Sequence, residues 1–233
     1  AVAEQLGIEF HLLDGRAIFQ EKVVDPFARE YFSGRTPSPC LICNREIKFG
    51  FLADFAASIG AEYIATGHYA AVKTDEHGES YLAKAVDLKK DQSYFLCRIK
   101  KEVLAKIIFP LSGKTKDEIR RIAQEIGLKV ASKPDSQEVC FIADNDYKKF
   151  LHTHYGHGKT GFLRDCTGKA LLAHDGVENF TIGQRKGLGV ALGKVVYVND
   201  IDGETGDVVI GEQESLMSRE LLSADNSFHT AIP

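Results

Sequence analysis

The sequence predicts an α/β protein, with a parallel sheet in its first part and a small sheet or barrel in its last part. In the first 70 residues, apolar stretches of strand type alternate with stretches of helical periodicity, as in doubly wound parallel sheets. From about Gly158 onward, glycine recurs and β-branched residues cluster, which is typical of small sheets. We therefore divide the chain into residues 1–133, 134–190 and 191–233.

The first part contains the clearest alternation of elements. Ala1–Gly7 has the character of a helix end, and its last residue is a typical C-terminal stop. Ile8–Leu13 predicts a short apolar strand, and Asp25–Phe32 predicts a helix. Cys43–Ile59 has apolar residues at helical spacing, so it predicts a second helix. Tyr63–Ala65 then predicts a buried strand.

Further along the chain, the elements become more varied. Tyr81–Ala85 predicts a strand. Thr115–Ile126 predicts an amphipathic helix with a capping box, because a glutamate lies three residues after the capping threonine. Tyr147–His152 predicts a short helix. Lys194–Asn199 and Asp207–Ile210 are rich in β-branched residues and enclose turn-forming Asp-Gly, so they predict a hairpin.

The charge of the chain is unevenly distributed. The net charge of −4 argues against a general nucleic-acid binder. Residues 84–133, however, contain 13 Lys and Arg against 6 Asp and Glu, which makes this segment about +7 between two acidic flanks. A local basic region of this kind fits a polyanion. Solvated lysines on a helical region are the alternative explanation.

Other features of the composition restrict the class of protein. No apolar run approaches the roughly 20 residues of a membrane helix, and no secretory signal is visible. The five cysteines are odd in number and irregularly spaced, which argues against a secreted disulfide framework. We therefore predict a cytoplasmic protein. Because the chain begins at Ala1, inside a predicted helix, we expect it to be a fragment.

Cys40 and Cys43 form a Cys-x-x-Cys pair in a proline-stiffened loop. Such a pair is redox-active where a helix N-terminus lowers the thiol pKa, or it forms half of a metal or iron–sulfur site. We expect Cys43 at the start of its helix, with Arg45 and Lys48 adding positive charge. The alternative is a pair of buried structural cysteines.

Several other stretches contain residues with chemical potential. Thr66–Tyr69 follows a predicted strand, where α/β proteins bind ligands. Lys89–Phe95 mixes basic, amide and aromatic residues, as RNA-binding segments do. Phe180–Gly189 predicts a basic turn on RNA or a simple glycine-rich bend. Cys140 lies beside Phe141 and Ile142. Considered by itself, it is interpreted as a core cysteine at the start of a strand. The histidines His152, His154 and His157 lack usual zinc spacing, and we interpret them as a solvated loop.

Five motifs occur in a fixed order along the chain: GRTPSPCLICNREIKFG, ATGHYA, KDQSYFL, DSQEVCFI and FTIGQRKGLG. Together they resemble the tRNA-specific 2-thiouridylase family over essentially the whole chain. The resemblance implies a Rossmann-like domain of the adenine nucleotide hydrolase-like, ATP-pyrophosphatase type. It also implies a small central domain and a C-terminal β-barrel, which we expect to be partial here.

The resemblance assigns roles to individual residues. Cys43 matches the catalytic nucleophile and Cys140 the cysteine that carries the persulfide. Gly67 matches an ATP-contacting glycine. The positions that match contacts to the target base or the tRNA are Ser38, Pro39, Cys40, His68, Lys90, Asp91 and Gln92. No metal ligand is implied.

The implied reaction is ATP-dependent transfer of sulfur to C2 of the wobble uridine, position 34, in the tRNA anticodon stem-loop. ATP would adenylate the uridine oxygen with the help of Mg²⁺. The Cys140 persulfide would deliver sulfur, directly or after Cys43 releases it, and a Cys43–Cys140 disulfide would remain. The implied partners are tRNA and a sulfur-carrier protein, with no membrane involved.

Two alternatives and three departures accompany this interpretation. Cys40, Cys43 and Cys140 are enough to hold an iron–sulfur cluster that carries the sulfur. A non-catalytic RNA-binding fragment that uses residues 84–133 is the other alternative. The family's glycine–serine phosphate loop lies outside the chain, and the barrel appears shortened at Pro233. Cys40 also stands where some members have Asp.

Overall fold

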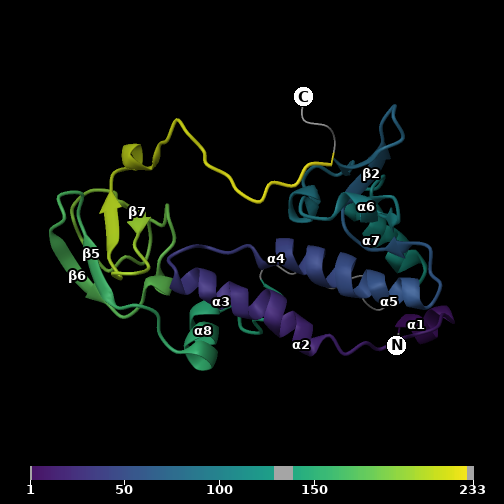
Figure 1. The fold of residues 1–233 in the computed structure, drawn as a ribbon, viewed down its shortest axis with the longest axis horizontal. Coiled ribbons are helices and arrows are strands. Elements are labelled where there is room, and N and C mark those ends of the chain that lie inside the picture. Colours follow the sequence, from purple (N-terminus) through teal and green to yellow (C-terminus); the bar gives the residue numbers. More distant parts are fainter. Residues whose placement is uncertain (1, 129–138, 230–233) are drawn as a thin grey trace. The chain divides into compact units, whose positions relative to one another are not determined.

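The computed structural model describes residues 2–128 and 139–229, and the chain forms two compact units (Figure 1). Unit 1 comprises Ala1–Lys22, Cys40–Gln137 and Asp225–Pro233, and unit 2 comprises Val23–Pro39 and Glu138–Ala224. Each unit is therefore built from separate stretches of sequence. The boundaries predicted at residues 133 and 190 stay a prediction about domain organisation.

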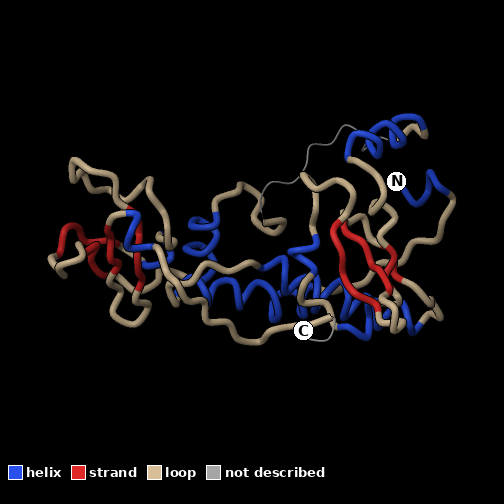
Figure 2. The backbone as a smooth tube through the Cα atoms, turned by 90° about the horizontal axis from the view of Figure 1, so that it is seen from above, coloured by secondary structure: helices blue, strands red, loops and turns tan. Residues whose placement is uncertain are grey.

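Unit 1 mixes short strands with helices. Strands β1 (Ile64–Ala65) and β4 (Ile107–Ile108) pair in parallel, with Ile64 opposite Ile107. The hairpin of β2 (Ala70–Thr74) and β3 (Ser80–Lys84) is antiparallel, and strands are red in Figure 2. The helices are α1 (Val2–Leu6), α2 (Arg16–Phe19), α4 (Pro39–Ile42), α5 (Leu52–Ser58), α6 (Lys101–Leu104) and α7 (Lys116–Glu125), with π-helical η2 (Cys43–Phe51) and 3₁₀-helical η3 (Ser93–Leu96).

An apolar core holds these elements together. Its buried members are Phe49, Ala70, Leu96, Ile99, Leu104, Ile107 and Phe109. They come from η2, both sheets, η3 and α6, so the helix that carries Cys43 and the strand that precedes Gly67 share one core. The predicted capping box of α7 is confirmed: Thr115 Oγ1 accepts from the Glu118 amide at 3.3 Å, and the Glu118 carboxylate accepts from the Thr115 amide at 2.7 Å.

The strand predicted at Ile8–Leu13 is wrong. These residues have no regular secondary structure, and the side chains of Ile8, Phe10 and Leu12 are 60%, 73% and 87% exposed. A strand is stable only when its amides and carbonyls pair with a neighbouring strand. The apolar pattern of this stretch carries no information about such a partner.

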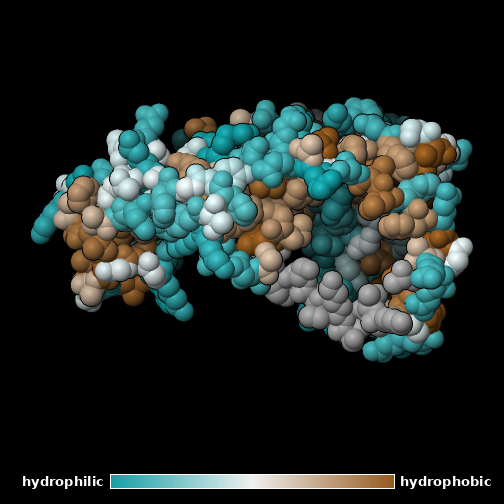
Figure 3. Space-filling model, turned by 90° about the horizontal axis from the view of Figure 1, so that it is seen from below, coloured by the Kyte–Doolittle hydropathy of each residue, from teal (hydrophilic) through white to brown (hydrophobic). Residues whose placement is uncertain are grey.

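Unit 2 contains a four-stranded sheet in the order β6-β5-β8-β7. Its strands are β5 (Gly161–Arg164), β6 (Ala170–His174), β7 (Tyr197–Ile201) and β8 (Val208–Gly211). Strands β7 and β8 form the hairpin predicted from the Asp-Gly turn, with Val198 opposite Ile210. Brown apolar side chains are visible on the surface of this unit (Figure 3), and Phe162 of β5 is 44% exposed.

The other elements of unit 2 are helical. They are α3 (Asp25–Phe32), α8 (Tyr147–Tyr155), 3₁₀-helical η4 (Val177–Asn179) and 3₁₀-helical η5 (Gln213–Leu216). The π-helical turn η1 (Gln20–Val24) contains one boundary between the two units, and α4 contains another, between Pro39 and Cys40. Helices α3 and α8 share a core of Phe27, Ala28, Tyr31, Ile142 and Leu151, while a second core lies under the sheet.

Candidate functional site

The helix that carries Cys43 begins earlier than predicted. Pro39 is the first residue of α4, and Ile42 has helical backbone angles, so α4 runs directly into η2. Proline is favoured at the first helical position because its missing N–H would have no partner there. The prediction that Cys43 starts the helix is therefore wrong. Cys40 is exposed in the first turn, and Cys43 is half-buried where the helix becomes π-helical.

Two polar side chains of η2 are fixed by contacts within unit 1. The buried Asn44 donates from Nδ2 to the carbonyl oxygen of Phe95 at 2.7 Å, and its Oδ1 has no hydrogen-bond partner within the described part of the chain. Lys48 Nζ lies 3.2 Å from His68 Nε2, which acts as the acceptor. The segment that starts with Cys43 is therefore held in one orientation.

His68 is a neutral imidazole at neutral pH. Burial, and then the charge of Lys48, lower its pKa from 6.5 to about 4. Because Nε2 accepts from Lys48, the proton lies on Nδ1, which is 2.8 Å from Thr66 Oγ1 and donates to it. The ring lies in an aromatic pocket, 6.1 Å from Phe109 and 6.2 Å from Phe49 between centroids. Its predicted contact with tRNA stays a prediction.

Gly67 follows β1 at the carboxyl end of the parallel pair. It is exposed, and a Cβ added there would meet only Leu111 Cδ1, at 3.9 Å. Its backbone is thus open to a ligand, at the edge where nucleotides bind in parallel α/β sheets. These features fit the predicted contact with ATP.

The segment from Lys90 to Gln92 contributes two side chains to the fold. Asp91 accepts from the Ala85 amide at 2.8 Å and from Ser93 Oγ at 2.5 Å. Gln92 Oε1 accepts from the Tyr69 amide at 3.0 Å. Lys90 is exposed. The three residues are all predicted tRNA contacts, but Asp91 and Gln92 also join the start of η3 to the two ends of the β2–β3 hairpin.

A basic concavity of about 330 Å³ lies in unit 1. It is lined by Arg45, Arg98, Lys100, Asp225, Asn226 and Ser227. Arg45 extends from η2, two residues after Cys43. Arg45 was predicted from the sequence as a positive charge near Cys43, but Arg98 and Lys100 were not, because only folding brings these residues together.

Cys140 lies in unit 2, on a turn in which the Ile142 amide donates to the Val139 carbonyl at 3.1 Å. Cys140 is exposed, whereas Ile142 is 5% exposed. Phe141 packs edge-on against Phe27, with ring centroids 5.3 Å apart. The interpretation of Cys140 as a core cysteine at a strand start is wrong, because its neighbours fill the core and turn the thiol outward. Ser136 and Gln137 of its motif lie outside the described residues.

The loop before Pro39 contacts Thr181 and, on strand β7 of the four-stranded sheet of unit 2, Ile201. Thr36 Oγ1 donates to Thr181 Oγ1 at 3.1 Å. A Cβ at Gly34 would lie 2.5 Å from Ile201 Cγ2, and Gly34 has a φ of +75°. Ser38 is half-buried and Pro39 is buried. The second half of the motif FTIGQRKGLG, from Arg185 to Gly189, lines a cavity of about 450 Å³ together with residues between 190 and 196.

Comparisons with known proteins agree with these features. A family profile described as tRNA methyl transferase HUP domain matches residues 1–144, and one described as tRNA methyl transferase PRC-barrel domain matches residues 148–212. Within the described ranges, 2–128 and 139–229, no helix is long and apolar enough to cross a membrane.

Curated relatives carry a more specific name. The tRNA-specific 2-thiouridylase MnmA of Carboxydothermus hydrogenoformans is 47% identical over 229 residues, which is 97% of this chain and 63% of that protein. MnmA 1 of Caldanaerobacter subterraneus is 48% identical with the same coverage, and MnmA of Acetivibrio thermocellus is 45% identical over 98% of this chain and 64% of its own length. The chain thus spans less than two thirds of these relatives. The chain therefore belongs to the family whose profile is described as tRNA methyl transferase HUP domain, and it is similar over nearly its whole length to relatives named tRNA-specific 2-thiouridylase.

Proposed function

We propose that the protein containing this chain transfers sulfur to C2 of the wobble uridine of tRNA in an ATP-dependent reaction in the cytoplasm. The identity to thiouridylases over nearly the whole chain supports the reaction class. The observation that carries the proposal is the contrast between the two thiols: Cys140 is exposed on a turn, and Cys43 is half-buried on a helix. An exposed thiol accepts sulfur from a carrier protein, and a fixed thiol acts on a bound intermediate.

Adenylation comes first in the proposed reaction. The uridine O2 attacks the α-phosphorus of ATP, pyrophosphate leaves, and C2 then carries AMP as a good leaving group. Gly67 offers open backbone for the nucleotide, and Mg²⁺ would neutralise charge on the phosphates. His68 is neutral and is hydrogen-bonded to Lys48 and Thr66. It therefore fixes the backbone directly after Gly67 without adding charge.

Sulfur transfer follows by one of two routes. In the first, the terminal sulfur of the Cys140 persulfide attacks C2 and expels AMP, and the Cys43 thiolate then attacks the Cys140 sulfur and releases the thiocarbonyl. In the second, the Cys43 thiolate attacks the Cys140 sulfur first, and the released hydrosulfide attacks C2 and expels AMP. Both routes leave a Cys43–Cys140 disulfide that a reductant must open.

The tRNA would be bound by phosphate contacts and by loops that receive the extruded base. The concavity lined by Arg45, Arg98 and Lys100 and the exposed Lys90 supply cations for the phosphates. Ser38 immediately precedes the helical segment that carries Cys43, and Pro39 and Cys40 begin it. These three residues are the proposed contacts to the base.

The test is tRNA thiolation by the full-length protein with single Cys→Ser variants. Cys43→Ser and Cys140→Ser are each expected to lower the rate by more than about 1,000-fold, since each removes a covalent step. Cys166→Ser, also an exposed cysteine, is the matched control and should keep the full rate. Full activity in either of the first two variants would exclude the proposal.

The same preparations separate the alternatives. An iron–sulfur enzyme would show iron and visible absorption after anaerobic purification, and loss of Cys40 would then abolish activity. A non-catalytic RNA-binding protein would bind tRNA equally well without Cys43 and Cys140 and would transfer no sulfur. Incorporation of a methyl group in place of sulfur would favour the activity that the family description names.

A further inference from the structure

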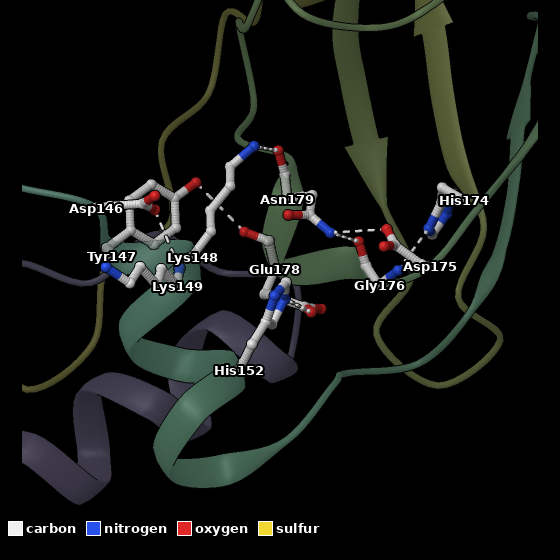
Figure 4. Close-up of polar contacts among 10 residues, drawn as sticks. All are labelled: Asp146, Tyr147, Lys148, Lys149, His152, His174, Asp175, Gly176, Glu178 and Asn179. Carbon is white, nitrogen blue, oxygen red and sulfur yellow. Dashed lines mark hydrogen bonds and ion pairs between the residues drawn. The ribbon is translucent and has the colours of Figure 1, made fainter.

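A cluster of two histidines and one glutamate lies in unit 2, outside the residues proposed for sulfur transfer. His152 is on α8, His157 follows that helix, and Glu178 is on η4 (Figure 4 labels His152 and Glu178). Each residue offers one potential ligand atom, and these atoms all lie within 4.8 Å of one another. The imidazoles of His152 and His157 stack, with centroids 4.0 Å apart. The predicted loop is thus wrong for His152 and His154, which both lie on α8, and His152 is half-buried while His154 and His157 are exposed.

The carboxylate of Glu178 is fully buried and only partly satisfied. Its side chain has an exposed fraction of 0%, and Oε1 lies 2.8 Å from His152 Nε2. Oε2 is buried too, and it has no hydrogen-bond partner among the described residues. A buried carboxylate oxygen without a partner destabilises the fold. This oxygen is therefore placed to bind a positively charged ligand.

The surrounding backbone makes room for this carboxylate. A Cβ added at Gly158 would lie 2.3 Å from Oε2, and one at Gly176 would lie 2.2 Å from both carboxylate oxygens. Tyr147 Oη donates to the Glu178 carbonyl oxygen at 3.3 Å, and Lys148 Nζ donates to the Asn179 carbonyl oxygen at 3.0 Å (Figure 4). These bonds fix the backbone of η4, and the close backbone of Gly158 and Gly176 with the bond to His152 limits the positions of the carboxylate, as suits a metal ligand.

We propose that His152, His157 and Glu178 bind a divalent transition-metal ion, with Zn²⁺ as the best match. Two imidazole nitrogens and one carboxylate oxygen form a set of three protein ligands that suits zinc, and water completes the coordination. His157 is exposed, so an ion can enter from solvent and keep a water ligand. The ion gives Oε2 a positive partner and replaces the proton between His152 and Glu178.

Such an ion would join three segments of unit 2. Helix α8 is anchored by the fully buried Leu151, and η4 is anchored by the fully buried Val177. The ion would tie both to the loop of His157. Because it binds the folded unit, it would raise the unfolding midpoint in proportion to the logarithm of its concentration.

The experiment uses the whole 233-residue chain after treatment with EDTA and alkylation of its cysteines, which removes competing thiolate ligands. Co²⁺ is titrated and followed by its visible d–d absorption, and Zn²⁺ is then added as a competitor. We expect one Co²⁺ per chain, displaced by Zn²⁺. His157→Ala should weaken binding at least about tenfold, because it removes one of three protein ligands.

Two further variants make the test specific. His154→Ala is the matched control, since His154 is exposed on the same helix but outside the cluster, and it should leave the affinity unchanged. Glu178→Gln keeps the shape and should abolish binding. If Glu178→Gln fails to fold, the exposed His157 still decides the matter. Absence of saturable binding in the parent chain, or equal affinity in His157→Ala and the parent, would overturn the proposal.

Discussion

Cys43 and Cys140 have the same chemistry but opposite surroundings. Cys43 lies half-buried on a helix of unit 1, next to the buried Asn44 and on the same segment as the Lys48–His68 pair. Cys140 lies exposed on a turn of unit 2. Its neighbours Phe141 and Ile142 pack into an apolar core. One thiol is positioned by a polar framework, and the other is presented by an aromatic anchor.

This difference matches the proposed division of roles between the two thiols. A cysteine that receives sulfur from a separate protein must be reached from outside, and an exposed turn allows that. A cysteine that acts on a tRNA-bound intermediate must keep one orientation, because misplacement by about 1 Å costs about 100-fold in rate. Disturbing each anchor separately should therefore affect one thiol and leave the surroundings of the other unchanged.

The largest effect is expected from Phe27→Ala. Phe27 is 2% exposed and contacts Tyr31, Phe141 and Phe150 through its ring. Its removal should lower the free energy of unfolding of unit 2 by about 3–5 kcal/mol. Urea denaturation followed by tyrosine fluorescence measures this change. Phe162→Ala is the control, because Phe162 is 44% exposed and should cost far less. If Phe27→Ala lowered the free energy of unfolding no more than Phe162→Ala, the apolar core would not be what positions Cys140.

A smaller effect is expected from Asp91→Ala in unit 1. The Asp91 carboxylate accepts from the Ala85 amide and from Ser93, so its loss should cost roughly 1–3 kcal/mol of stability. Lys90→Ala should leave stability within about 0.5 kcal/mol and instead weaken tRNA binding, with a reduced salt dependence. Thermal unfolding and filter binding separate the two effects. If Asp91→Ala weakened tRNA binding as much as Lys90→Ala and lost no stability, Asp91 would contribute only to tRNA binding.

The smallest effect is a pH dependence carried by His68. The folded chain takes up this proton near pH 4, whereas an unfolded chain takes it up near pH 6.5. The unfolded state therefore gains protons first as the pH falls, and stability is lost between pH 6.5 and 4 by on the order of 1–2 kcal/mol after solvent screening. NMR titration of the His68 ring checks the pKa. Lys48→Met should raise the pKa of His68 but leave it below 6.5, because burial is the larger cause of the shift. A pKa of His68 at or above 6.5 in the parent would contradict the polar framework.

Some of this arrangement follows from local sequence. The capping box at Thr115, the helix at Asp25–Phe32 and the hairpin of β7 and β8 were predicted because short-range patterns determine them. The capping, helical and hairpin signals each lie within a few residues of one another in the chain. The roles of Cys43, Cys140 and Gly67 come from the ordered motifs and stay predictions.

Other features depend on contacts that sequence spacing does not encode. The Ile8–Leu13 strand failed because an apolar pattern does not specify a partner strand. The helix begins at Pro39 and not at Cys43 as predicted, because proline is favoured at the first helical position. Glu178 joins His152 across 26 positions, so the cluster was invisible in the spacing of the histidines alone. Arg98 and Lys100 join Arg45 in the same way.

The most direct test of the division between the two thiols is to locate the donated sulfur. The full-length protein is incubated with a persulfide-donating carrier protein, and tryptic peptides are read by mass spectrometry without reduction. The account predicts one added sulfur on the Cys140 peptide, retained in Cys43→Ser and absent in Cys140→Ser. A persulfide on Cys43 that persists in Cys140→Ser would contradict it.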